Sequence, residues 1–460
     1  MADDAWMIEQ HFGLGARADA PAQPTSASRA LLDEFSRYQA SPPLWQQYQQ
    51  TLPSLEQALQ EKRMINQAAS PDDKMQLRQQ MRKEAKDSYT DAVQVRAQVA
   101  QQTDTPFVER LVYFWANHFA ISAQKSEVTQ AAGLFELQAI RPFVLGTFKD
   151  MLFAVEKHPA MLFYLDQQQS RGPESEAVQR QMRRQPDKKA GLNENLAREI
   201  LELHTLGVRS GYSQQDVTEF ARALTGWTIP NPKLTGETDA RYPGFMFNPR
   251  VHEPGNRQLL GKTYTQDGVQ QAEAILADLA ASPATATHLA TKLACHFAGD
   301  QPPPALINRL RDTYLQTGGQ LTALYRLLID APECRLPSAL KFKPPWEWLI
   351  SSVRALDIDL SQVRVSQVMT QLGQPIWKPD SPAGYDDVAD SWLASNALLR
   401  RVEYAQRLAT LTKLSLPPAT LANTVLRSRL SQETLQQISR AESAHTGFAL
   451  LVVSPEFLRR

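Results

Sequence analysis

Apolar residues recur at helical spacing through most of this chain, from Ala30 to Arg407. Side chains three and four residues apart share one face of an α-helix, so this periodicity favours amphipathic helices over strands. Clear β signals are confined to one region, where short runs at Phe245–Phe247 and Arg257–Leu260 flank a turn. We therefore predict an all-α, mostly helical fold with one small β-hairpin near residues 245–260.

The length of 460 residues is enough for two or three lobes around a large core. We expect an N-terminal helical lobe over residues 1–228, a hairpin connector over 229–265 and a C-terminal helical lobe over 266–460. One continuous globule is the alternative. Basic and acidic residues both total 49, which gives no net charge. This balance argues against a general nucleic-acid binder, because such proteins carry a basic excess.

The first residues, Met1–Asp4, carry acidic side chains where a signal peptide needs basic ones, and no apolar segment follows them. The apolar run Phe448–Val453 is too short to span a bilayer. We therefore expect a cytoplasmic protein without a membrane span. Cys295 and Cys334 have no partner at metal-ligand spacing, so we expect two reduced, buried thiols, with a single disulfide as the alternative.

Two segments interrupt the helical pattern. Arg171–Ala190 has almost no large apolar side chains and several basic ones, so we expect a mobile loop there, and a docking surface for an acidic partner is the alternative. Gly373–Asp386 is a long loop that contains Trp, Pro and Gly, a composition typical of ordered surface loops that carry function.

The densest set of ionisable side chains lies in Gly191–Trp227, which we predict to form two helices. Asn195, Arg198, Glu199 and Glu202 fall at i, i+3, i+4 and i+7 and so share one face of the first helix. Gly207 is expected to end this helix. Ser213 and Asp216 have the spacing of a capping box that begins the second helix.

Three interpretations of this polar face remain open. In the first it is structural, with Arg198 bridging Glu194 and Glu202 in a partly buried seam. In the second it is a metal site, with Glu199, Glu202 and His204 as candidate ligands and His118 or His252 arriving from elsewhere. A straight helix cannot make those three side chains converge, and there is no HExxH motif or Cys/His pair, so we expect no metal and no cofactor. The third interpretation is acid–base catalysis by Glu199 or Glu202 in a pocket under the Gly373–Asp386 loop.

Several phrases together resemble one large bacterial family, catalogued as domain of unknown function family 1800. These phrases are FWANHF (114–119), HPAMLFYLD (158–166), LNENLAREILELHTLGV (192–208), TGW (225–227), GQPIWKPDSPAGYDD (373–387) and SPEF (454–457). The resemblance implies no established reaction, cofactor or substrate. It implies that many relatives are exported, which leaves a periplasmic location open. It also implies gene neighbours that resemble sulfatases and phosphatases.

The family motif positions that carry polar or aromatic side chains are the candidate functional residues. The candidates for catalysis are Glu199, Glu202 and His204, and the candidates for binding are Trp115, Asn117, His118, His158, Asn193, Glu194, Arg198 and Trp227, to which the hairpin adds His252. Two function classes follow. The first is a helical binding or accessory protein that works with a partner enzyme resembling sulfatases or phosphatases. The second is a hydrolase, metal-assisted or using a carboxylate as acid and base, with its site where the two lobes meet.

Overall fold

A computed structural model describes residues 11–19, 27–52, 70–185, 191–231, 234, 236–336 and 341–460. Of these described residues, 63% are helical and only 4% are in strands, so the prediction of a mostly helical fold is confirmed. The α-helices are α2 (Ala27–Arg37), α3 (Pro43–Thr51), α5 (Pro71–Gln102), α6 (Pro106–His118), α7 (Ser126–Phe135), α8 (Phe148–Lys157), α9 (Pro159–Tyr164), α10 (Glu176–Arg184), α11 (Asn195–Glu199), α12 (Gln214–Leu224), α13 (Val269–Ala281), α14 (Pro283–Ala298), α15 (Pro304–Gln316), α16 (Leu321–Asp330), α17 (Pro345–Ala355), α18 (Val365–Gln371), α19 (Ser395–Ala409), α20 (Pro418–Leu426), α21 (Gln432–Ser439) and α22 (Ala444–Val453).

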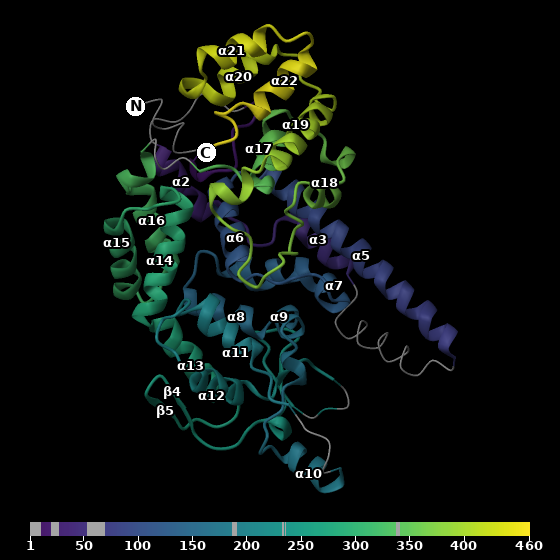
Figure 1. The fold of residues 1–460 in the computed structure, drawn as a ribbon, viewed down its shortest axis with the longest axis vertical. Helices are drawn as coiled ribbons and strands as arrows, with labels where there is room; N and C mark the ends of the chain where they lie inside the picture. Colours follow the sequence, from purple (N-terminus) through teal and green to yellow (C-terminus); the bar gives the residue numbers. More distant parts are fainter. Residues whose placement is uncertain are drawn as a thin grey trace.

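The helices form an elongated body in which α17 to α22 occupy one end and α8 to α13 the other (Figure 1). Helix α6 lies between these ends, and α14, α15 and α16 flank one side. Buried apolar residues from Phe12 to Phe457 form one cluster that runs through both ends. The expected division at residues 228 and 265 stays a prediction.

The long helix α5 positions much of the later argument. Ser70 caps its first turn by accepting a hydrogen bond from the Asp73 amide, and Pro71 provides its first residue. Its first half is largely exposed and projects from the body (Figure 1). From Ala85 onward one side of α5 is buried against α3, α7, α17 and α18. The composition of residues 52–102, which is rich in Gln, Lys, Arg, Glu and Ala, predicts a solvated helix, and this prediction is wrong for the second half of α5.

Two small antiparallel sheets contain the described strands, which are β1 (Trp227–Thr228), β2 (Glu237–Thr238), β3 (Met246–Phe247), β4 (Arg257–Leu259) and β5 (Lys262–Tyr264). The expected hairpin between Phe245–Phe247 and Arg257–Leu260 is wrong. Instead β3 lies between β1 and β2, while β4 pairs with β5. Leu260 and Gly261, both with positive φ, form the two-residue turn between β4 and β5. Such turns match the twist of two short antiparallel strands, and a Leu-Gly pair is a weak signal for one.

Residues Glu176–Arg184 form α10, although we expected a mobile loop over Arg171–Ala190. The helix is anchored at its start, because the Glu174 amide donates to a Glu253 carboxylate oxygen at 2.8 Å and Val178 is buried. Residues 186–190 of that prediction lie outside the described part of the chain. Contacts with the distant segment 249–253 thus accompany a helix in a sequence that is polar almost throughout.

Cys295 and Cys334 are both free, as predicted, but only Cys334 is buried, and the expected burial of Cys295 is wrong because that residue is partly exposed. Within the described ranges, no helix combines the length and the hydropathy that crossing a bilayer requires.

Candidate functional site

The first helix of the Gly191–Trp227 stretch is not a straight α-helix. Its α-helical part, α11, ends at Glu199, and Ile200–His204 continue as a single turn of π-helix. Gly207 then takes a left-handed conformation with φ of 93°. Ser213 and Asp216 form the predicted capping box at the start of α12. The π-turn changes the rotation between successive side chains, so spacing rules for an α-helix fail after Glu199.

Arg198 makes only half of the expected bridge. Its Nη2 lies 3.2 Å from Glu194 Oε2 and donates to Gln214 Oε1 at 2.9 Å. Glu202 instead accepts a hydrogen bond from the Tyr212 hydroxyl at 3.0 Å. The Arg198 and Glu194 side chains are 39% and 30% exposed. The stripe is therefore a partly exposed ion pair beside a separate hydrogen bond, and the predicted bridge from Arg198 to Glu202 is wrong.

His204 points away from Glu199 and Glu202 into the core. Its Nδ1 donates to Glu156 Oε1 at 2.7 Å, and both side chains are almost completely buried. Burial raises the pKa of Glu199, and the nearby Glu202 carboxylate adds to this shift. No group of three or more His, Cys, Asp or Glu side chains in the described ranges could hold a metal ion.

Two histidines from other helices bind the end of the π-turn. His118 Nε2 donates to the His204 carbonyl at 3.1 Å, and His288 Nε2 donates to the Leu203 carbonyl at the same distance. Carbonyls at a helix end have no partner within the helix, so these side chains satisfy them. Burial lowers the pKa of His118 far below its usual value, and the charge of Lys292 lowers it further. Both contacts are structural and hold the 203–207 turn against α6 and α14.

Three further candidates, on α6 and at the starts of α9 and α11, also make structural contacts. His158 Nδ1 accepts from the Ala160 amide, which caps α9. Trp115 Nε1 donates to the Tyr325 hydroxyl at 2.7 Å in the core. Asn193 Oδ1 accepts from the Asn195 amide and its Nδ2 donates to the Leu165 carbonyl. These family positions determine how the helices begin and pack.

The last two candidates lie near the first sheet. His252 Nδ1 donates to the Thr225 carbonyl at 2.8 Å. Trp227 is 1% exposed, and the Lys157 ammonium lies 5.6 Å from the centre of its ring. The sequence signal TGW therefore identifies a packed corner of the fold rather than a site.

Asn117 is the exception among the candidates, because it lines a pocket. Its Nδ2 donates to the Tyr385 carbonyl and its Oδ1 accepts from the Tyr385 amide, both at 2.8 Å. Gly384 lies so close that a Cβ there would collide with the Asn117 backbone carbonyl. Trp377 and Pro379 of the same loop are tied to the residues after α6 through their carbonyls, which accept from the Ala123 amide and the Ser122 hydroxyl. The Gly373–Asp386 loop is therefore ordered and covers the pocket.

The pocket has an empty volume of about 480 Å³, including the part open to solvent. It is lined by Arg96, Tyr113, Ala116, Asn117, Ala120, Ile121, Trp346, Gln374, Ile376, Trp377, Pro379 and Tyr385. These residues come from α5, α6, the segment directly after α6, α17 and the loop. A pocket under the loop was predicted, but its lining does not include Glu199 or Glu202, and its main residues were missed.

Arg96 is the charged residue of this pocket. Its side chain is 7% exposed, and its Nε lies 2.9 Å from Glu136 Oε2 and 3.1 Å from Glu136 Oε1. Trp377 Nε1 also donates to this carboxylate, at 3.0 Å. The guanidinium carbon lies 4.1 Å from the ring centre of Tyr113 and 4.4 Å from that of Trp346, within the range of cation–π attraction. Glu136 and the rings therefore hold the guanidinium in one orientation.

The terminal nitrogens of Arg96, Nη1 and Nη2, have no hydrogen-bond partner among the described residues. Arg141 provides the contrast: its Nε donates to the Ala40 carbonyl, and both of its terminal nitrogens donate to Glu109. Buried polar groups in proteins are normally hydrogen-bonded. The unpaired edge of a nearly buried guanidinium in a pocket is therefore the feature that most resembles a binding site.

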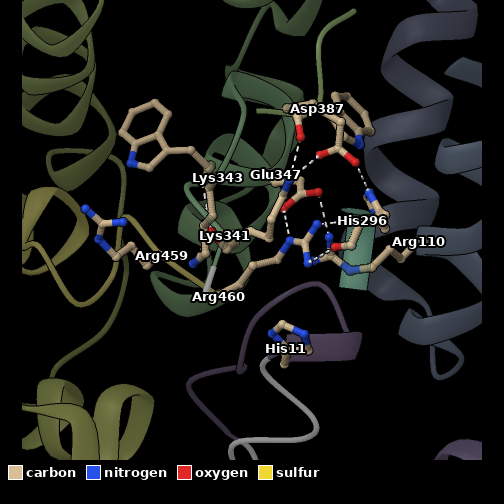
Figure 2. A network of polar contacts seen from close by, with 12 residues as sticks. His11, Arg110, His296, Lys341, Lys343, Glu347, Asp387, Arg459 and Arg460 are labelled. Carbon is tan, nitrogen blue, oxygen red and sulfur yellow. Dashed lines mark hydrogen bonds and ion pairs between the residues drawn. The ribbon is translucent and has the colours of Figure 1, made fainter. Parts of the chain in front are cut away.

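A second charged cluster joins Arg110 of α6 to side chains of α14, α17 and the C-terminal segment (Figure 2). Arg110 Nη1 and Arg460 Nε each lie 2.6 Å from a different oxygen of Glu347. His296 Nδ1 donates to Asp387 Oδ2 at 2.7 Å, and Lys341 Nζ lies 3.5 Å from Asp387 Oδ1. Figure 2 shows Arg110 and Arg460 converging on Glu347.

Burial alone would raise the pKa of Glu347, but the charges of Arg110 and Arg460 outweigh it and hold that pKa well below its usual range. For the cation Lys343 burial acts in the opposite direction and lowers the pKa well below its usual value. Its Nζ donates to Ser351 Oγ at 3.1 Å. This cluster joins residues near the C-terminus to α6, α14 and α17. Its carboxylates form ion pairs with cationic side chains of the same chain, so the cluster is a structural connection.

Comparison with known proteins gives one match. The model of a family described as Protein of unknown function (DUF1800) matches residues 8–459. No curated protein and no solved structure matches the chain.

Proposed function

The chain belongs to the DUF1800 family of proteins of unknown function, and we propose that it is a ligand-binding protein that acts as an accessory to a partner enzyme. The proposed recognition site is the pocket around Arg96. The observation that carries this proposal is the Arg96 guanidinium, which is nearly buried, held by Glu136 and unpaired at its outer edge. Ligand sites in proteins typically combine apolar and aromatic walls with a few fixed polar groups.

The lining of the pocket supports binding rather than catalysis. Among the described residues, the lining contains no Asp, Glu, His, Cys, Ser or Lys side chain. Its ionisable hydroxyls belong to Tyr113 and Tyr385, and burial raises the pKa of both well above the usual value for tyrosine. Both therefore remain protonated at neutral pH. A general acid or base needs a pKa near the working pH, so the pocket lacks one.

The binding proposal is tested with the protein labelled with 5-fluorotryptophan. The ¹⁹F signals of Trp346 and Trp377 are assigned from Trp→Phe variants and followed while small carboxylates, amides, phosphate and simple sugars are added. We expect at least one compound to shift these two signals and to leave the buried Trp45 and Trp115 unchanged. A panel in which no compound perturbs the pocket signals would overturn the proposal.

The partner we propose is an enzyme resembling sulfatases or phosphatases, which is what the family resemblance suggests. The test is hydrolysis of 4-nitrophenyl sulfate and 4-nitrophenyl phosphate by the enzyme encoded beside this chain's gene, with and without added protein. We expect the wild-type protein to change the rate and the Arg96→Lys variant to change it less. An unchanged rate with both substrates, together with no complex in size-exclusion chromatography, would refute the partnership.

A hydrolase is the second candidate, and the raised pKa of Glu199 is the observation that favours it. A partly buried carboxyl beside a second carboxylate is a common arrangement for a general acid. If this is correct, the purified protein alone hydrolyses the same two substrates, and Glu199→Gln removes that activity while Glu194→Gln does not. Equal activity in both variants, or none in the wild type, would exclude this candidate for these substrates.

A further inference from the structure

We infer that the Arg96 pocket selects a ligand with a single carboxylate attached to a flat apolar group. This inference rests on the proposed function and specifies the ligand class of the same pocket. It depends on three observations: the free edge of Arg96, the charge of Glu136 behind it and the aromatic walls.

The free edge of Arg96 fits a carboxylate. A guanidinium presents its N–H groups as a planar fork, and the two oxygens of a carboxylate match this fork with two parallel hydrogen bonds. In Arg96 only Nε is used, and it faces both oxygens of Glu136. The two terminal nitrogens remain for a second acceptor group. Arg110 differs, because its Nη1 binds Glu347 and its Nη2 binds the Gly13 carbonyl.

The charges around the pocket favour a monoanion over a dianion. Glu136 is completely buried and already balances the charge of Arg96. The lining residues include no second cation. Lys378, in the covering loop, places its Nζ 5.1 Å from the ring centre of Tyr89 and is not part of the lining. A phosphate or sulfate dianion would therefore have two charges opposite one guanidinium that is already paired, which is unfavourable in a partly dry site.

The walls favour a flat apolar group next to the carboxylate. Tyr113, Trp346, Trp377 and Tyr385 all line the pocket. Trp346 and Tyr113 are arranged edge to face, with ring centres 5.4 Å apart. Aromatic rings bind other flat groups through offset or edge contacts of this kind. The Asn117 amide bonds through both its nitrogen and its oxygen to the Tyr385 backbone, which fixes its place in the wall.

The probes are benzoate, its neutral analogue benzamide, and inorganic phosphate, followed by saturation-transfer difference NMR at about pH 8.5, where phosphate is almost entirely a dianion. We expect benzoate to bind at least tenfold more tightly than benzamide, and phosphate not to displace it. Benzamide binding as tightly as benzoate would overturn the requirement for a charge. Displacement of benzoate by equimolar phosphate would overturn the preference for a monoanion.

The matched variants are Arg96→Lys and Arg141→Lys. Both keep a positive charge and lose the planar N–H donors of the guanidinium. We expect Arg96→Lys to weaken benzoate binding at least tenfold and Arg141→Lys to leave it unchanged, because Arg141 is already fully paired. Equal effects of the two variants would overturn the role of Arg96. The comparison of benzoate with benzamide uses the wild type, so it decides the question even if Arg96→Lys fails to fold. Failure of benzoate while another panel compound shifts Trp346 and Trp377 overturns this inference alone, and failure of the whole panel overturns the proposed function as well.

Discussion

Replacement of Glu347 by glutamine tests whether the buried charge cluster stabilises the fold. Glu347 lies between Arg110 and Arg460, 2.6 Å from each, and the three side chains are at most 11% exposed. Glutamine has nearly the same shape, so the change removes the charge without opening a cavity. It leaves two guanidinium groups close together with no carboxylate between them.

The magnitude follows from the burial of the cluster. Removing one partner of a buried ion pair costs about 3–5 kcal/mol, because the remaining charges stay desolvated and unpaired. Other hydrogen bonds of Arg110 and Arg460, to the Gly13 and His296 carbonyls, reduce the loss toward the lower figure. We therefore expect Glu347→Gln to lower the free energy of unfolding by about 3 kcal/mol.

The control is Glu194→Gln, which removes the same charge from the exposed pair with Arg198. Exposed pairs contribute about 0–1 kcal/mol, so this variant should be close to the wild type. Both free energies are measured by urea unfolding at pH 7. If Glu347→Gln loses no more stability than Glu194→Gln, the argument from burial is refuted.

Three further predictions follow from the described contacts. Burial lowers the pKa of His158 to about 3, below the value of about 6.5 in the unfolded chain, so acid favours unfolding, and this histidine should lower the free energy of unfolding by about 2 kcal/mol between pH 6.5 and pH 5. The variant His158→Asn keeps a capping acceptor but cannot titrate, so it should reduce the pH dependence of urea unfolding by that amount. An unchanged pH dependence would disprove the assignment to His158. Asn117→Ala removes both hydrogen bonds to the Tyr385 backbone and should cost about 1–3 kcal/mol; amide exchange should accelerate in residues 373–387, and exchange as slow as in the wild type would contradict this role. Gly207→Ala and Gly211→Ala both place alanine at a φ near +93°, at a cost of about 1–2 kcal/mol. Only Gly207→Ala also adds a Cβ 3.0 Å from His288 Nδ1, so it should be the more destabilising of the two in thermal unfolding. Equal losses of stability would show that His288 moves away freely.

Local signals in the sequence predicted local structure well. The pair Thr105-Pro106 predicts an N-cap followed by a first helical residue, and Pro106 does begin α6. Ser213 with Asp216 forms the predicted capping box of α12. In each case the residues that determine the feature lie within a few positions of one another. The cap of α6 shows where this stops, because Thr105 makes no capping hydrogen bond with its side chain. Glu34 instead accepts from the Phe107 and Val108 amides, from more than 70 residues away.

The polar face of the central helix was misjudged for a related reason. The argument that Arg198 bridges Glu194 and Glu202 assumed a regular α-helix and a second surface packed against it. The π-turn at Ile200–His204 changes the direction of the side chains after Glu199, and the Tyr212 hydroxyl, beyond the turn, donates a hydrogen bond to Glu202. Rare helix geometry of this kind depends on tertiary partners, here the His118 and His288 side chains that bind the Leu203 and His204 carbonyls. No spacing rule within the helix contains that information.

The pocket itself had one signal in the sequence. In α5 the buried residues Tyr89, Ala92, Val93 and Ala100 follow helical spacing, and Arg96 lies on the same face. A charge in the middle of an apolar stripe requires a buried partner, and Glu136, 40 residues later, provides it. Because the surrounding run is rich in Gln, Lys and Glu, the sequence favoured a solvated face and concealed the stripe. Glu136 binds one nitrogen of the Arg96 guanidinium and leaves its outer edge free. Burial of this edge identifies Arg96 as a functional candidate, although none of the phrases that resemble the family contains it.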